Sequence, residues 1–142
     1  MDVSGLSRAP TVVSISELRS MARGRLRDAE VLLAAGRYDG AMYLCGYAIE
    51  AALKARICRA LKWPGYPDTR REFEGYLSFR THDLEILLHL SGTENKIKTN
   101  HLAEWSIVAT WDSNVRYRPI GSTSSQDATD MIQATKVILG AL

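Results

Sequence analysis

Two polar groups in this sequence have the residue types that chemistry on a phosphate needs. In the first, Lys96 and His101 are separated by the residues IKTN. A histidine can exchange protons near neutral pH, and a lysine can stabilise charge on a phosphate. The alternative is an exposed, polar first turn of a helix, which the run KIKTNH suits well. We favour this alternative and keep Lys96 and His101 as candidate catalytic residues.

The second group is Arg116, Tyr117 and Arg118, which follow a predicted helix and lie close to Trp111. Two guanidinium groups around an aromatic ring could hold a phosphate and stack on a base. In the alternative, one arginine pairs with Asp112 or another carboxylate while Tyr117 packs against the protein. The sequence leaves both open, and these three residues are the candidate ligand-binding site.

Glu50 is a carboxylate within the apolar run 41-AMYLCGYAIEAALKA-55, at the edge of a predicted apolar helix face. A carboxylate there needs a partner, because an unpaired charge is costly to bury. Lys54 follows it by four positions, in the favourable Glu-to-Lys order. His82 is a second candidate partner; alternatively it is exposed in the first turn of a later helix, where Asp83 complements the helix dipole. We therefore interpret Glu50, Lys54, His82 and Asp83 as structural polar residues.

A stripe of arginines, Arg19, Arg23 and Arg27, recurs every four residues on the first predicted helix. Such a stripe can contact phosphates, with binding that weakens as salt rises. More often it is the solvated face opposite the core. The formal net charge of +2 is too small to decide the matter.

Several chemistries are excluded by spacing. The sequence has no Cys/His pattern for zinc, no Glu-x-x-His pair for a di-iron bundle and no glycine-rich phosphate loop. We therefore expect no metal and no cofactor. No apolar run reaches the ~18 residues of a membrane span, and the first residues do not resemble a signal peptide. A cytoplasmic protein is the expectation.

Helical periodicity positions these residues. Ser14 and Glu17 form a capping-box pattern before a first helix that ends at Gly36. A second helix has Asp39 as its expected N-cap and ends before Trp63-Pro64, and the short link makes the two helices antiparallel neighbours.

Three further helices are expected beyond this pair. They are a short one capped by Thr81 and ending at Gly92, one over about 95–112, and one capped by Ser124 or Ser125. No segment alternates as a long strand would. Residues 68–80 read as a charged linker or a short helical turn. The prediction is an all-α, up-and-down bundle of four to five helices, with a mobile tail over residues 1–13 and a single domain over 14–142.

The order of these motifs resembles the HEPN domain family. The second helix matches the family pattern at Ala48, Glu50, Leu53, Lys54 and Ala55; the third helix opens with His82-Asp83-Leu84; and Arg116-Tyr117-Arg118-Pro119 loosely matches an Arg-Tyr-Pro motif after an aromatic residue. The resemblance covers about residues 16–141. It implies a helical bundle that dimerises and that often pairs with a minimal nucleotidyltransferase in prokaryotic toxin–antitoxin or defence modules.

Active HEPN domains are metal-independent ribonucleases that use an arginine followed, after four to six residues, by a histidine. None of the three histidines here has an arginine at that spacing. Only Lys96 precedes His101 with a positive charge, and lysine lacks the planar fork that arginine offers a phosphate.

The resulting prediction is a homodimeric binding or regulatory module, with a nucleotidyltransferase, an RNA or a nucleotide as its partner. One alternative is a ribonuclease toxin with a divergent centre, and another is a structural interaction protein with no role in nucleic-acid binding.

Overall fold

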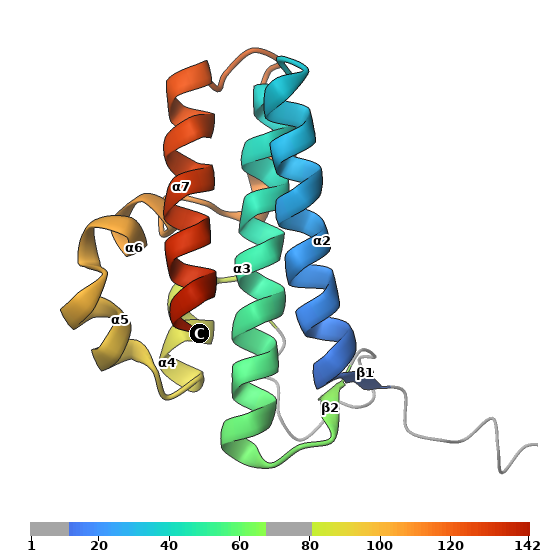
Figure 1. The fold of residues 1–142 in the computed structure, drawn as a ribbon, viewed down its shortest axis with the longest axis vertical. Helices are drawn as coiled ribbons and strands as arrows, with labels where there is room; N and C mark the ends of the chain where they lie inside the picture. The colour runs from blue at the N-terminus through green and yellow to red at the C-terminus, as the bar shows by residue number, and fades with distance from the viewer. Residues whose placement is uncertain (1–11, 68–80) are drawn as a thin grey trace, which may run out of the picture.

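A computed structural model describes residues 12–67 and 81–142 of the chain (Figure 1). Its elements, in chain order, are β1 (Val12–Ser14), α2 (Ile15–Ala34), α3 (Tyr38–Leu61), β2 (Gly65–Pro67), α4 (Leu84–Leu90), α5 (Glu94–Asn100), α6 (Leu102–Val108), the 3-10 helix η2 (Ser113–Tyr117) and α7 (Ser125–Ala141). Long helices α2, α3 and α7 stand side by side, and α4 to α6 lie beside α7 (Figure 1). The predicted all-α bundle is confirmed.

The α2–α3 hairpin forms as local signals predict. The Ser14 hydroxyl accepts the Glu17 N–H at 3.1 Å and satisfies one of the free donors at the start of α2. Gly36, at a φ of +74°, makes the tight turn into α3. The two helices pack against each other along their length, as antiparallel neighbours.

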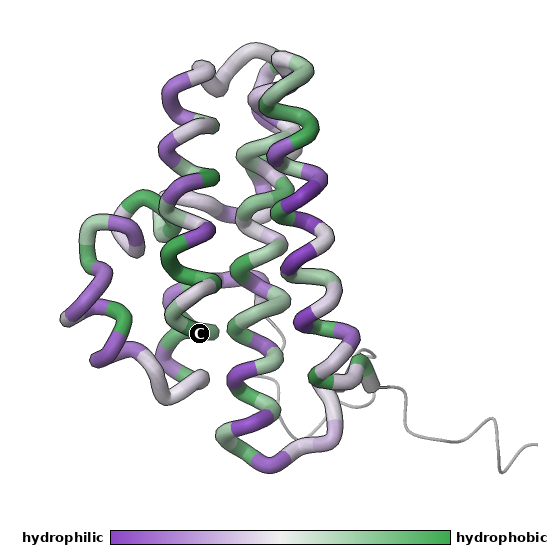
Figure 2. The backbone as a smooth tube through the Cα atoms, in the orientation of Figure 1, coloured by the Kyte–Doolittle hydropathy of each residue, from purple (hydrophilic) through white to green (hydrophobic). Residues whose placement is uncertain are grey.

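Helix α3 is the centre of the bundle. It packs against α2, α4 and α7, so consecutive residues from Ala48 to Ala51 are all buried, including Glu50. In Figure 2 the tube of α3 carries many apolar residues, whereas the tube of α2 alternates between hydrophilic and apolar residues along its length. A helix that is apolar on most sides is one that its neighbours enclose.

Side chains cap α7 and α4, and the side-chain cap expected for α3 is absent. Ser124 caps α7 and forms a reciprocal capping box with Asp127, within the predicted choice of Ser124 or Ser125. Asp83, not Thr81, caps α4: its carboxylate accepts the N–H groups of Glu85 and Ile86. The expected N-cap at Asp39 is wrong, because α3 already begins at Tyr38 and the Asp39 carboxylate faces another segment.

The single helix predicted over about 95–112 is two short helices. The break falls at His101, where φ is −138° and ψ is 37°, outside the helical region. Bending there lets Ile97 of α5 and Trp105 of α6 both enter the core. The segment ends as a helix at Val108 rather than 112.

A two-stranded ribbon joins the ends of the hairpin. Strand β1 pairs antiparallel with β2, with Val13 opposite Tyr66. The predicted tail over 1–13 therefore extends too far, since residues 12 and 13 are strand; three residues are too few for an alternating pattern to reveal. Residues 1–11 and the linker or helical turn expected over 68–80 lie outside the described residues. No helix within residues 12–67 and 81–142 has the length and apolar character of a membrane span.

Candidate functional site

Glu50 connects two helices through its carboxylate. Its Oε2 accepts from Lys54 Nζ at 3.0 Å, and its Oε1 lies 2.9 Å from His82 Nδ1. Glu50 itself is only 7% exposed. Both candidate partners are therefore in contact with it, and the buried carboxylate has both oxygens occupied.

The segment that carries His82 is held by hydrogen bonds from its own backbone N–H groups to nearby side chains. The Thr81 hydroxyl accepts the Asp83 N–H at 2.9 Å, and Asp83 in turn caps α4. These local bonds fix the entry into α4, so the imidazole reaches Glu50 from a defined direction. Because an ionised carboxylate only accepts hydrogen bonds, Nδ1 of His82 is the donor, which leaves Nε2 for another partner.

His82 is also at the surface. Its side chain is 58% exposed and lines a cavity of about 580 Å³ between the start of α4 and the segment that joins α6 to η2. The remaining lining residues come from those same two segments: Thr81, Asp83, Leu84, Glu85, Ala109, Thr110, Trp111, Asp112 and Ser113. The two sequence interpretations of His82, a partner of Glu50 and an exposed residue, therefore both hold.

Trp111 anchors the far wall of this cavity. Its Nε1 donates to the Tyr43 carbonyl at 3.2 Å, and its ring meets that of Tyr47 edge to face at 5.1 Å. The ring packs directly onto Gly46 of α3, where an added Cβ would lie 1.9 Å from Trp111 Cε2. Gly46 thus permits the close approach that sets the position of the α6–η2 segment.

The cavity is lined by carboxylates. Asp83 caps α4, and Asp112 accepts the Asn114 N–H at 2.7 Å. The Trp105 N–H bonded to Glu85 lowers the pKa of that carboxyl, with help from Lys98. Negative charge on these groups disfavours a phosphate inside the cavity and favours a cationic group or a hydrogen-bond donor.

The cavity lining ends before the Arg116–Arg118 segment. Ser113 lines the cavity and is also the first residue of η2, whereas none of residues 116–118 lines it. Arg118 is exposed, Tyr117 is 74% exposed, and the side chain of Arg116 lies outside the described residues. The fold therefore brings His82 and the start of η2 to one cavity and leaves the three candidate ligand-binding residues outside its lining.

Asp39 holds the loop that follows. Its carboxylate accepts the N–H groups of Gly121 at 2.6 Å and Thr123 at 2.9 Å. The hydrogen bond from Gly121 holds the pKa of Asp39 below its usual value, although partial desolvation acts against it. This bond fixes the segment between η2 and α7 to the first turn of α3.

Lys96 and His101 have separate partners. Lys96 Nζ donates to the Ala141 carbonyl at the end of α7, at 2.8 Å, and His101 Nδ1 lies 3.8 Å from Glu104 Oε1. Lys96 lies in α5, which ends at Asn100, and the His101 N–H donates to the Ile97 carbonyl at 2.8 Å. The favoured alternative, a polar turn of a helix, therefore forms over most of this run. Nothing in the geometry of the described residues joins them into one centre.

The cavity could not be predicted from the sequence because a turn builds one of its walls. The sequence predicts Thr110, Trp111 and Asp112 as the end of a helix, whereas the helix ends at Val108. One local signal was available: Asp112 followed by Asn114 is typical of a turn in which the aspartate accepts a backbone N–H. Among the described residues, no three His, Cys, Asp or Glu side chains lie close enough together to bind a metal ion.

The family model for the HEPN domain matches residues 15–70 of the chain. This segment includes α2, α3 and β2, and therefore Gly46, Glu50 and Lys54 of the site. No curated protein and no solved structure matches the chain. The matched helical hairpin lies within an all-α bundle, as the motif order implied, so the chain resembles the HEPN domain family over residues 15–70.

Proposed function

We propose that this HEPN-like chain is a binding and regulatory module that acts through a protein partner, without the family's usual ribonuclease centre. The observation that carries the proposal is the cavity beside His82. Its carboxylates, Asp83, Glu85 and Asp112, suit a lysine or arginine of a partner better than they suit a phosphate.

The sequence supports the same conclusion. No arginine precedes any of the three histidines at the spacing that active HEPN ribonucleases use. The three histidines instead face glutamates: His82 faces Glu50, His89 faces Glu94 and His101 faces Glu104. A minimal nucleotidyltransferase is the partner class that the family suggests, in a toxin–antitoxin or defence module of the cytoplasm.

Co-elution with a minimal nucleotidyltransferase encoded beside this protein tests the proposal. Thr110→Arg places a positive charge on the cavity wall at an exposed position, and we expect it to abolish co-elution. Thr99→Arg, at an exposed position on α5, is the matched control and should co-elute as the wild type does. If the two variants co-elute equally with the nucleotidyltransferase, the cavity is not part of the interface.

RNA binding is tested separately. Replacing Arg116 and Arg118 with alanine should weaken any salt-dependent retention of RNA or nucleotide, because both guanidinium groups are lost. Retention that the double substitution leaves unaltered would exclude this segment as a nucleic-acid site. If the wild type retains neither RNA nor nucleotide, a protein is the remaining class of partner.

A second candidate function is a metal-independent ribonuclease, and the Glu50–His82 pair favours it. A carboxylate bonded to Nδ1 orients an imidazole and leaves Nε2 available to move a proton. His82→Ala should then abolish cleavage of a mixed RNA pool, whereas His89→Ala, at another exposed His–Glu pair, should not. Cleavage that depends on His82 would replace the proposed function; no cleavage by the wild type would support it.

A further inference from the structure

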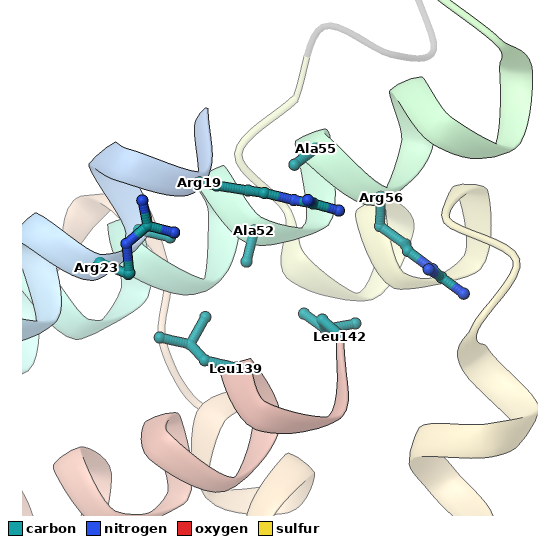
Figure 3. Close-up of a pocket in the computed structure, with 8 residues that line it drawn as sticks. Arg19, Arg23, Ala52, Ala55, Arg56, Leu139 and Leu142 are labelled. Carbon is teal, nitrogen blue, oxygen red and sulfur yellow. The ribbon is translucent and has the colours of Figure 1, made fainter. Parts of the chain in front are cut away.

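A second cavity, of about 260 Å³, lies between α2, α3 and the end of α7. It shares no lining residue with the cavity beside His82. Arg19 and Arg23 come from α2 and Arg56 comes from α3, and Leu139 and Leu142 of the α7 end face them across the opening (Figure 3). We call this the arginine pocket.

The floor of the arginine pocket is apolar because alanines stand where larger side chains would fill the space. Ala22 and Ala55 are buried, and Ala52 is half-buried. Together with the two leucines they form a surface that gains by contact with an aliphatic group. No aromatic ring of the described residues lines the pocket, so this lining offers no platform on which a nucleobase could stack.

The described side chains that line the pocket do not neutralise its charge. They include three arginines and no Asp or Glu. No ion pair joins Arg19, Arg23 or Arg56 to another residue in the described part of the chain, whereas neighbouring charges such as Arg25 and Lys136 have carboxylate partners. Figure 3 shows Arg19 extending over the alanine floor toward Arg56.

We propose that the arginine pocket binds a small phosphate ester with a short aliphatic body. Guanidinium groups bind phosphate oxygens through paired hydrogen bonds, and three of them match a dianion better than a single carboxylate. The volume of about 260 Å³ is below the ~300–1,000 Å³ of pockets for drug-sized ligands, so the ligand is small. The aliphatic body would lie on Ala52 and Leu139.

The test compares butyl phosphate with inorganic phosphate on the full chain, by calorimetry and by methyl NMR of labelled alanines. We expect butyl phosphate to bind at least about tenfold more tightly, because its chain buries apolar surface. Methyl signals of Ala22, Ala52 and Ala55 should shift. Thr110→Arg should leave this binding unchanged, so failure here is distinguishable from failure of the proposed function.

Two variants separate the charge from the floor. Arg19→Ala with Arg56→Ala should weaken both phosphates by about tenfold or more, since hydrogen bonds between charged groups are lost. Arg27→Ala, on the same helix but outside the pocket, is the matched control and should bind as the wild type does. Ala52→Leu should remove the advantage of butyl phosphate over inorganic phosphate and leave the latter's affinity unchanged.

Three results would overturn the proposal. The first is no binding of butyl phosphate to the folded wild type at millimolar concentration. The second is equal affinity in the double arginine variant; if that variant also changes its oligomeric state, the pocket is assigned to a contact between copies of the chain. The third is tighter binding of an RNA oligonucleotide than of butyl phosphate at these arginines.

Discussion

Glu50 and Gly46 lie one helical turn apart on α3 and position the two sides of the cavity beside His82. Glu50 binds the residue before the cap of α4, and Gly46 receives the ring of Trp111. Glu50 adds a charge to the interior that only its partners compensate. Gly46 has no side chain, and the Trp111 ring occupies the space that a side chain would fill.

Glu50→Ala should lower the free energy of unfolding by about 2–3 kcal/mol, because it leaves the Lys54 amine without its carboxylate in a half-buried site. Urea unfolding measures this change. The control is Glu30→Ala, which removes a Glu–Lys pair of similar length, 3.1 Å to Lys136, at the surface. It should cost no more than ~1 kcal/mol. Wild-type stability of Glu50→Ala, with lost partner binding, would make Glu50 a functional residue instead.

Gly46→Ala should destabilise the protein by about 2–3 kcal/mol or more, because the new Cβ would overlap the Trp111 ring and a packed core resists such additions. Gly24→Ala is the matched control: nothing lies within 4 Å of its Cβ position in α2, so it should be neutral or stabilising by up to ~1 kcal/mol. In a Trp111→Ala background the cost of Gly46→Ala should disappear. If thermal unfolding still shows the full cost there, the ring is not its cause.

Among the elements, two connecting segments near the site are each held in position by a single side chain. The α6–η2 segment is held by Trp111, and the loop before α7 by Asp39. The break at His101 turns one predicted helix into two, and the side chains of His101 and Lys96 contact different groups. A contact from one side chain therefore holds each of these two segments against α3.

The Asp39 contact predicts a pH dependence. Its folded pKa is below the ordinary value of 3.8, so the stability it contributes is present above that value and is lost as the pH falls through the folded pKa. The Gly121 amide proton shift should follow this titration, with a midpoint below 3.8. Asp39→Asn should abolish the step, and Asp130→Asn, on α7, should leave it. A midpoint at or above the ordinary value would contradict the assigned contact.

At the scale of the whole molecule, oligomerisation remains a prediction from the family. Four aromatic residues, Tyr43, Tyr47, Trp63 and Tyr66, would support a dimer if the bundle left their rings at the surface. In the structure Tyr66 is 2% exposed and the other three are half-buried within the chain, so these rings do not argue for a dimer.

Light scattering tests the homodimer directly. The expected mass is twice the chain's 15.8 kDa, independent of dilution over the micromolar range. Thr110→Arg should leave the dimer intact if the cavity beside His82 serves another protein. Only monomer at high concentration would reject the homodimer.

The features that could be predicted from the sequence are those that depend on residues close together along the chain. Capping at Ser14 and Ser124, the turn at Gly36 and the Glu50–Lys54 pair all join residues within about one helical turn, where spacing fixes geometry. The apolar stripes were long enough to predict the central helices and the bundle. The Glu50–His82 contact could be predicted only as one of two alternatives for His82, because it joins residues 32 positions apart.

The tertiary structure alone decided the site. The Trp111–Tyr43 and Asp39–Gly121 contacts join residues 68 and 82 positions apart, and the cavity and the arginine pocket exist only where several elements meet. Periodicity records which face of a helix is buried and not which neighbour buries it. Packing around α3 therefore had to show that His82 and the start of η2 line one cavity, while Lys96 and His101 do not form a pair.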